Sequence, residues 1–370
     1  MAHLEVLEHS TIYRNPVANK VSEYVAFPAI CALPDETLLC LCHHGSARES
    51  DDATVKVHRS TDGGRSWECT GPLPSLPGKD GGPPRVAGGF GVTKEGEVLA
   101  WAGCGRGDDD DDDEGTIYSV RSRDGARWQE PTAFDVGAYP AFYLCMNLAT
   151  LPDSTLVLPG EAPGGKAPSV PEDHWAGLVS RSTDGGRTWE PVQAAHISKN
   201  PFYMDLRVTT LADGRVLGVY WTHDMEKDCG LNVHTTHSDD AGRTWSEPRD
   251  AGFWGQVTDV CGLQSGRVIA VTNHRREPLG IRAVLSEDGG VTFDETNHLE
   301  LWGVEPARVR SAPVLAPKRD VIENVMHSYH HFTFGTPSVT QLADGTIAVA
   351  FYVTEESVTY VRCCLLAERE

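Results

Sequence analysis

A short motif, Ser-x-Asp-x-Gly-x-Thr-Trp, occurs five times in this sequence and restricts the possible folds more than any other feature. The clearest copies are Ser60–Trp67, Ser182–Trp189 and Ser238–Trp245. In Ser286–Phe293 a Phe replaces the Trp, and Ser122–Trp128 is one residue short. The motif aspartates are 48 to 62 residues apart, a spacing that is typical of a solenoid, a propeller or an array.

The residue types of the motif are those of a tight turn. An Asp carboxylate can accept backbone N–H groups across such a turn. The Gly adopts a positive φ without a steric penalty, and the aromatic ring buries a large apolar area beneath the hairpin. We therefore interpret all five copies as elements that close hairpins and carry no catalytic role.

A second repeat runs in step with the first and consists of an apolar run, a Pro/Asp/Gly turn and another apolar run, which is the pattern of a hairpin. Its six copies are Pro28–Leu41, Val92–Trp101, Leu148–Leu158, Val208–Tyr220, Val260–Val271 and Val339–Tyr352. Six copies predict six blades in one domain spanning residues 1–370. The last blade is one strand short, and we expect Leu4–Tyr13 to supply that strand and close the ring.

The repeated motif resembles the Asp box, or BNR repeat, of sialidases. In that family the motif lies on the hairpin between the third and fourth strands of each blade, away from the active site. The resemblance covers residues 20–362 and implies an all-β, six-bladed β-propeller of four-stranded antiparallel blades. It says little about the reaction, because one fold hosts many chemistries.

Bulk properties narrow the possible partners. The formal net charge of −21 argues against nucleic acid and against an anionic membrane. Residues 1–19 contain no apolar run of signal length, so we expect a cytoplasmic protein. The ten Cys form no Cys-x-x-Cys pair, so we expect neither a metal nor another cofactor. The oligomeric state is not indicated.

Polar and aromatic residues occupy the positions that would reach the functional face of such a propeller, namely the start of the first strand of each blade and the loop after the second. They are Tyr24, Phe27, His43, His44, Arg48, Glu49, Asp51, Asp52, Arg85, residues 104–114, Tyr143, Asn147, Glu161, Tyr203, Asp205, Arg207, His223, Asp224, Gln256, Asp259, His274, Arg275, Arg276, Arg282, Tyr329, His330, His331, Thr336 and Glu355. Their convergence on one face predicts a site for a carbohydrate.

Some of these residues match positions that carry function in sialidases, which use three Arg, a Tyr nucleophile assisted by a Glu, and an Asp acid/base. Asp205, nine residues before Gly214, stands where the resemblance implies the Glu. Glu49 and Asp52 fall in the loop that would bear the acid/base Asp. Arg282, just ahead of a motif copy, resembles one of the family's Arg residues.

Two positions depart from the family pattern. Ala26 stands where the first Arg of a sialidase would precede an Ile-Pro. Thr336, nine residues before Gly345, stands where the nucleophilic Tyr would lie. We therefore expect a sialidase-like enzyme that cleaves a terminal glycosidic bond, of an acidic sugar, by chemistry other than that of ordinary sialidases.

Three functions remain open. In a glycosidase, Asp205 and one of Glu49, Asp51 or Asp52 would share the acid and base roles, with Tyr203 as a further catalytic candidate. In a polysaccharide lyase, an Arg would neutralise a uronate carboxylate and a His would remove the α-proton. The candidates are Arg207, Arg275 and Arg276, with His43, His44, His223, His274 and His330. The third function is a non-catalytic propeller that stacks aromatic rings on a sugar.

Overall resemblance favours the hydrolase. Further substrate-binding candidates are Arg85, Tyr143, Gln256 and Arg282.

Overall fold

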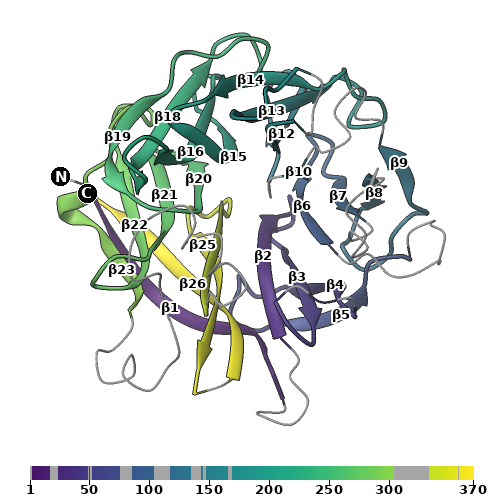
Figure 1. Cartoon of the computed structure of the whole chain (residues 1–370). Coiled ribbons are helices and arrows are strands. Elements are labelled where there is room, and N and C mark those ends of the chain that lie inside the picture. The colour runs from purple at the N-terminus through teal and green to yellow at the C-terminus, as the bar shows by residue number, and fades with distance from the viewer. Residues whose placement is uncertain are drawn as a thin grey trace.

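The computed structural model describes the chain as an all-β protein. It describes residues 2–16, 24–48, 50, 52–75, 86–103, 117–134, 143–144, 147–165, 169–303, 333–356 and 358–370. These residues form six antiparallel sheets arranged as blades around a ring (Figure 1). The predicted six-bladed propeller of four-stranded blades is confirmed. Among the described residues, no helix is long and apolar enough to cross a bilayer.

Blades 1 to 5 run from an inner to an outer strand in chain order, and blades 3 and 4 carry an extra two-residue strand. Blade 1 comprises β2 (Tyr24–Ala32), β3 (Leu38–Gly45), β4 (Thr54–Ser60) and β5 (Glu68–Pro72). Blade 2 comprises β6 (Val86–Val92), β7 (Val98–Gly103), β8 (Ile117–Ser122) and β9 (Thr132–Phe134). Blade 3 comprises β10 (Tyr143–Leu144), β11 (Ala149–Thr150), β12 (Leu156–Pro163), β13 (Trp175–Ser182) and β14 (Gln193–Ser198).

Blades 4 and 5 follow the same order, whereas the outer strand of blade 6 comes from the N-terminus. Blade 4 comprises β15 (Phe202–Thr210), β16 (Val216–Asp224), β17 (Cys229–Gly230), β18 (Asn232–Ser238) and β19 (Arg249–Trp254). Blade 5 comprises β20 (Thr258–Gly262), β21 (Val268–His274), β22 (Gly280–Ser286), the short 3-10 helix η1 (Glu295–Asn297) and β23 (Leu299–Gly303). Blade 6 comprises β24 (Phe334–Gln341), β25 (Ile347–Glu355) and β26 (Val358–Arg369), together with β1 (His3–Arg14).

The N-terminal strand closes the ring. β1 pairs with β26 in antiparallel register, with Ser10 opposite Cys363 and Arg14 opposite Tyr360. Figure 1 shows the purple β1 beside the yellow β26. Strand β1 is therefore the outer strand of blade 6, as predicted from the sequence, and pairing leaves β26 with no exposed edge.

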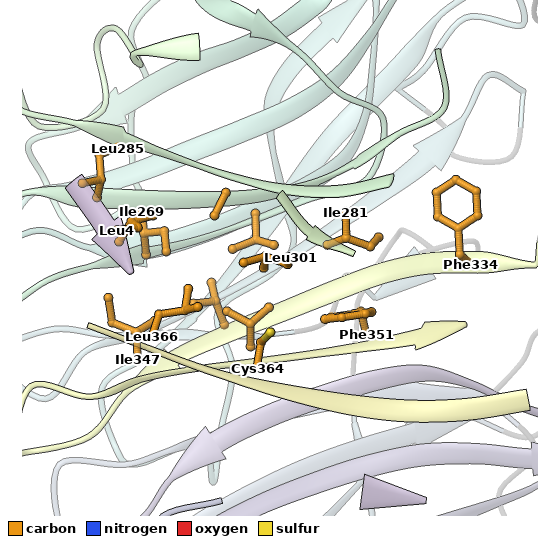
Figure 2. Close-up of a cluster of buried hydrophobic side chains, with 14 of the residues drawn as sticks. Leu4, Ile269, Ile281, Leu285, Leu301, Phe334, Ile347, Phe351, Cys364 and Leu366 are labelled. Atoms are coloured by element: carbon orange, nitrogen blue, oxygen red, sulfur yellow. The ribbon is translucent and has the colours of Figure 1, made fainter. Parts of the chain in front are cut away.

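Apolar side chains fill the spaces between neighbouring blades. Between blades 5 and 6, Ile269 and Ile281 face Ile347 and Phe351, and Leu4 of β1 joins the same cluster (Figure 2). Strand residues alternate between the two faces of a blade, so each blade contributes one apolar layer to each neighbour. This packing requires flat, closely spaced blades and leaves the strand ends free to carry polar groups.

The Asp boxes form the predicted turns. Asp62 Oδ1 accepts the N–H groups of Arg65 and Ser66 at 3.0 and 2.9 Å, and Ser60 Oγ accepts the N–H of Gly64 at 2.9 Å. The same bonds recur at Asp184, Asp240 and Asp288. In the short copy, the two donors move one residue closer to the aspartate. The hairpin interpretation is confirmed by these contacts.

The last Gly of each Asp box also packs against the preceding blade. Gly290 has a φ of +85°, and a Cβ added there would lie 2.4 Å from Leu217 Cδ2 of blade 4. A Cβ at Gly186 would lie 2.6 Å from Leu99 Cδ2 of blade 2. The same turn that closes a hairpin therefore sets the spacing between two blades.

We predict that Gly290→Ala destabilises the protein by roughly 1–3 kcal/mol more than Gly266→Ala, because the new methyl overpacks Leu217. Gly266 has a similar φ of +88° with no atom within 4 Å of an added Cβ, so its variant carries only the left-handed backbone cost of about 1–2 kcal/mol. Urea unfolding of both variants measures the difference. Equal losses would contradict the packing argument.

We also predict that the Asp62 box contributes stability that disappears in acid. Hydrogen bonds from the hydroxyl and then the N–H of Ser66 lower the pKa of Asp62 from 3.8 to about 2. A depressed folded pKa means that the stabilisation is present above about pH 4 and lost as the pH falls towards 2. Asp62→Asn should therefore be less stable than the parent at pH 6 and match it near pH 2, as measured by denaturant unfolding across pH. A difference that is independent of pH would refute this.

Candidate active site

The innermost strands of blades 1, 2, 4 and 6 share a β-bulge near their start. At three of these bulges a residue other than Gly has a positive φ: Phe27 at 51°, Asp205 at 52° and Thr336 at 46°. Such backbone is costly and is concentrated at functional sites. A bulge also redirects a side chain from the ladder, so the repeated bulge marks the end of the ring where function is expected.

The bulge of blade 4 brings two carboxyl groups together. Glu161, near the end of β12 in blade 3, accepts the backbone N–H of Asp205 through Oε2 at 2.5 Å. The same oxygen accepts the indole N–H of Trp175 at 2.9 Å. The Asp205 carboxylate accepts two hydrogen bonds from the guanidinium of Arg207, at 2.9 and 3.1 Å. The result is a carboxyl group beside a fixed ion pair.

The surroundings of Glu161 bring its pKa into the neutral range. Burial and then the negative charge of Asp205 raise the pKa of Glu161 to about 7. The N–H groups of Asp205 and Trp175 and the charge of Arg207 oppose this shift. A carboxyl group with such a pKa can both donate and accept a proton near neutral pH.

A third carboxyl group, that of Asp259, links three blades beside this pair. Asp259 Oδ2 accepts the N–H of Val339 at 2.8 Å and the side-chain amide of Asn147 at 3.2 Å. Asn147 also donates to Ser338 Oγ at 2.9 Å. Burial raises the pKa of Asp259, and the positive charge of Arg207 opposes this. Asp259 therefore joins blades 3, 5 and 6 near Arg207.

Arginine side chains from blades 1 and 5 meet around Tyr24. Arg275 donates to Gln256 Oε1 at 2.7 Å and to the carbonyl of Phe334 at 2.8 Å. Burial raises the pKa of Tyr24 above its usual range, and the charges of Arg48 and Arg275 oppose the shift. Tyr24 is therefore a neutral phenol between two cations, not a tyrosinate.

The other two candidate arginines of blade 5, Arg276 and Arg282, are held by backbone carbonyls. Arg276 donates to the carbonyl of Gly230 at 2.9 Å and lies over the Trp254 ring, 4.3 Å from its centroid. Arg282 donates to the carbonyl of Pro278 at 3.1 Å. These contacts fix the two guanidinium groups within blades 4 and 5.

The candidate histidines are tied into their own blades. His44 Nε2 lies 3.1 Å from His58 Nε2, and His223 Nε2 lies 3.0 Å from Asp228 Oδ1. His274 Nδ1 lies 2.9 and 3.0 Å from two backbone carbonyl oxygens, so it carries a proton. Their assignment as catalytic bases stays a prediction.

The side-chain contacts of Tyr203 and Asp52 are with residues other than Glu161, Asp205 and Arg207, which we call the Glu161 cluster. The Tyr203 ring packs against the rings of Tyr220 and His196, with centroids 5.1 and 6.1 Å away. The exposed Asp52 carboxylate accepts the N–H and hydroxyl of Ser46 at 2.9 and 3.0 Å. These contacts close a loop and a blade interface, and the catalytic roles expected of both residues stay predictions.

The chain's sequence matches the model of a described family, the BNR repeat-like domain, over residues 36–349. The protein belongs to the BNR repeat-like domain family. None of the curated proteins compared with it matches in sequence.

Solved structures extend this likeness to the whole BNR propeller. A Dyadobacter fermentans protein of unknown function has 16% identity and a TM-score of 0.74, covering 99% of both chains. A Streptococcus pneumoniae sialidase has 12% identity and a TM-score of 0.64, covering 98% of this chain and 70% of that one. A Penicillium chrysogenum α-L-arabinanase bound to arabinobiose has 14% identity and a TM-score of 0.65, covering 98% of both. These likenesses show the fold alone.

Several residues expected at the site of this BNR repeat-like protein lie outside the described part. They are Glu49, Asp51, Arg85, residues 104–114, Tyr329, His330, His331 and the side chain of Tyr143. Their roles stay predictions.

Sequence reasoning placed Glu161 on the functional face but gave it no role. Its position at the end of the second strand of a blade was the available signal. Every blade has a residue at that position, so the position does not single out Glu161. Its contact with Asp205 joins residues 44 positions apart and depends on the bulge in β15. Neither feature is visible in the one-dimensional pattern.

We predict that Asp205→Asn lowers the pKa of Glu161 below its value of about 7. The variant removes the neighbouring negative charge and leaves the positive charge of Arg207 without its ion-pair partner. Asn tolerates the positive φ at this position. NMR of the carboxyl carbon of Glu161 measures the titration. Asp213→Asn, at the turn beyond the other end of β15, is the matched control and should leave the titration unchanged. An unshifted Glu161 in Asp205→Asn would contradict the charge coupling.

Proposed function

We propose that this protein is a glycoside hydrolase that cleaves a terminal glycosidic bond, with Glu161 as the general acid. The observation that carries the proposal is the pair formed by Glu161, with its pKa of about 7, and the adjacent Asp205. Glycoside hydrolysis generally uses two carboxyl groups with different protonation states. The two residues come from adjacent blades, as expected for a site at the strand ends of a propeller.

In the proposed mechanism, protonated Glu161 gives its proton to the glycosidic oxygen as the bond to the leaving group breaks. A water molecule then adds to the anomeric carbon and gives a proton back to the Glu161 carboxylate. The Asp205 carboxylate, held by Arg207, faces the positive charge that develops on the sugar ring and stabilises it. Trp175 and the Asp205 N–H fix the orientation of the Glu161 carboxyl group. The burial of Tyr24 gives no support to a tyrosinate nucleophile.

The proposed substrate carries a carboxylate. Arg48, Arg207 and Arg275 come from three blades and are 4%, 3% and 6% exposed. Buried guanidinium groups on strand ends and loops of several blades favour an anionic sugar, in spite of the overall negative charge. The structural neighbours include both a sialidase and an arabinanase bound to a neutral disaccharide, so a neutral arabinan belongs in the test.

Elimination on a uronate is the second candidate. Burial and then the charge of Arg282 lower the pKa of His274, so this imidazole is neutral at pH 7 beside Arg275 in the chain. A neutral base next to a cation is what removal of a proton α to a carboxylate requires. We rank it second because His274 Nδ1 is already committed to two backbone carbonyls.

The direct test incubates the protein with sialosides, uronate- or rhamnose-capped oligosaccharides and arabino-oligosaccharides, and follows reducing ends and the ultraviolet absorbance of an unsaturated uronate. Reducing ends without that absorbance support hydrolysis. Absorbance that rises with product would replace the proposal with elimination. No product from any substrate, together with binding of a sugar, would leave a non-catalytic propeller.

We predict that Glu161→Gln lowers the hydrolysis rate by about 10²- to 10⁴-fold, because the amide cannot donate the proton. Binding of the substrate should change little, as measured by calorimetry on the variant. Since the acid must be protonated, the parent's activity should fall as the pH rises above about 7. Glu226→Gln, an exposed position in blade 4, is the control and should retain full activity. A Glu161→Gln variant with unchanged rate would exclude Glu161 as the acid.

A further inference from the structure

We propose that Cys42, His44 and His58 form a binding site for a thiolate-preferring metal ion such as Zn²⁺, where the N-terminal strand closes the ring. Within the described part of the chain, these residues are the one group of potential ligands whose atoms all lie within 4.8 Å of one another. This site is separate from the Glu161 cluster and does not depend on the proposed hydrolase activity.

The strands of blade 1 bring the three ligands together. Cys42 and His44 are two residues apart on β3, so both side chains point to the same face of the blade. His58 lies on the adjacent strand β4, opposite Cys40, and reaches the same face. The imidazole rings of His44 and His58 are nearly parallel, with an interplanar angle of 17° and centroids 5.3 Å apart.

The distances suit a tetrahedral ion with small adjustments. Bond lengths of about 2.0–2.1 Å from zinc to nitrogen and about 2.3 Å to sulfur place two nitrogens about 3.3 Å apart, and a nitrogen and a sulfur about 3.6 Å apart. The Nε2 atoms of His44 and His58 are 3.1 Å apart. The remaining separations fall within the 4.8 Å limit of the group.

The site is enclosed by protein. Cys42, His44 and His58 are 0%, 2% and 1% exposed. Tyr13, on strand β1, packs its ring against both imidazoles, with centroids 4.6 and 5.6 Å away. An ion bound here would therefore hold β3 and β4 together directly beneath the strand that closes the propeller.

The donor set defines the class of metal. One thiolate and two imidazoles suit Zn²⁺ or Cu⁺, whereas Mg²⁺ and Ca²⁺ prefer oxygen ligands. A second thiol, Cys40, has its Sγ 3.7 Å from that of Cys42 but lies outside the group. The sequence carries no paired-cysteine motif because the ligands are spaced as Cys-x-His on one strand with the third on the next.

The competing explanation is a metal-free pair of imidazoles that share one proton, as the 3.1 Å contact allows. The thiol distinguishes the two, because a shared proton needs no contribution from Cys42. A metal site also predicts an optical signature: Co²⁺ bound by a thiolate gives a ligand-to-metal charge-transfer band in the near ultraviolet.

The experiment unfolds the full chain in denaturant with a chelator and refolds it with Zn²⁺, with Co²⁺ or without metal, so that burial does not block loading. We expect one equivalent of Co²⁺ per chain, a thiolate charge-transfer band, and a higher melting temperature with Zn²⁺ than without. Cys42→Ala should lose the band and the Zn²⁺-dependent rise. The matched control Cys31→Ala, a buried thiol on β2 of the same blade, should keep both.

Two results would overturn the proposal. If the refolded parent chain gives neither a charge-transfer band nor a Zn²⁺-dependent rise in melting temperature, the histidines are a metal-free pair. If Cys42→Ala refolds and keeps the Zn²⁺-dependent rise, the ion binds elsewhere. His58→Gln gives a second check, because it removes a ligand without touching sulfur and should also lose the band.

Discussion

The contact between an Asp-box turn and the preceding blade is the interaction on which the rest of the structure depends. The last Gly of the box approaches an aliphatic side chain of the preceding blade, as Gly290 approaches Leu217 and Gly242 approaches Val157. Side chains just ahead of the boxes reinforce this contact, since Arg121 and Arg181 donate to box carbonyls of the following blades. Spacing between blades is therefore set by backbone in van der Waals contact, and a larger residue at this Gly has no space.

The packed Asp-box turns hold one end of the blades in place, which allows the opposite strand ends to carry features that cost folding free energy. Positive φ at Asp205, a pKa near 7 at Glu161 and a buried carboxyl at Asp259 each cost folding free energy. They lie on innermost strands or strand ends that neighbouring blades hold on both sides. The cost is met by the packed layers between blades, which is how a propeller can maintain several charged groups near its axis.

The sequence allowed most of the fold to be predicted. Turn chemistry is local, so the five Asp boxes, the six hairpins and the need for an N-terminal closing strand were all readable from residue types and spacing. For the site, the sequence predicted only which positions would lie on one face, and not which side chains would be in contact. Glu161 and Asn147 were expected on one face, yet nothing local indicates that Glu161 binds the backbone of Asp205 or that Asn147 meets Asp259.

The sequence by itself determined the repeat, the turns and the number of blades, because each depends on residues within about a dozen positions of one another. Only the tertiary structure decided which side chains share an environment. The neutral-range pKa of Glu161 arises from burial and from the charge of Asp205 on another blade. The Cys42, His44 and His58 group likewise depends on strand register. Electrostatic and ligand chemistry act through space, and strand pairing within a blade and packing between blades set those distances.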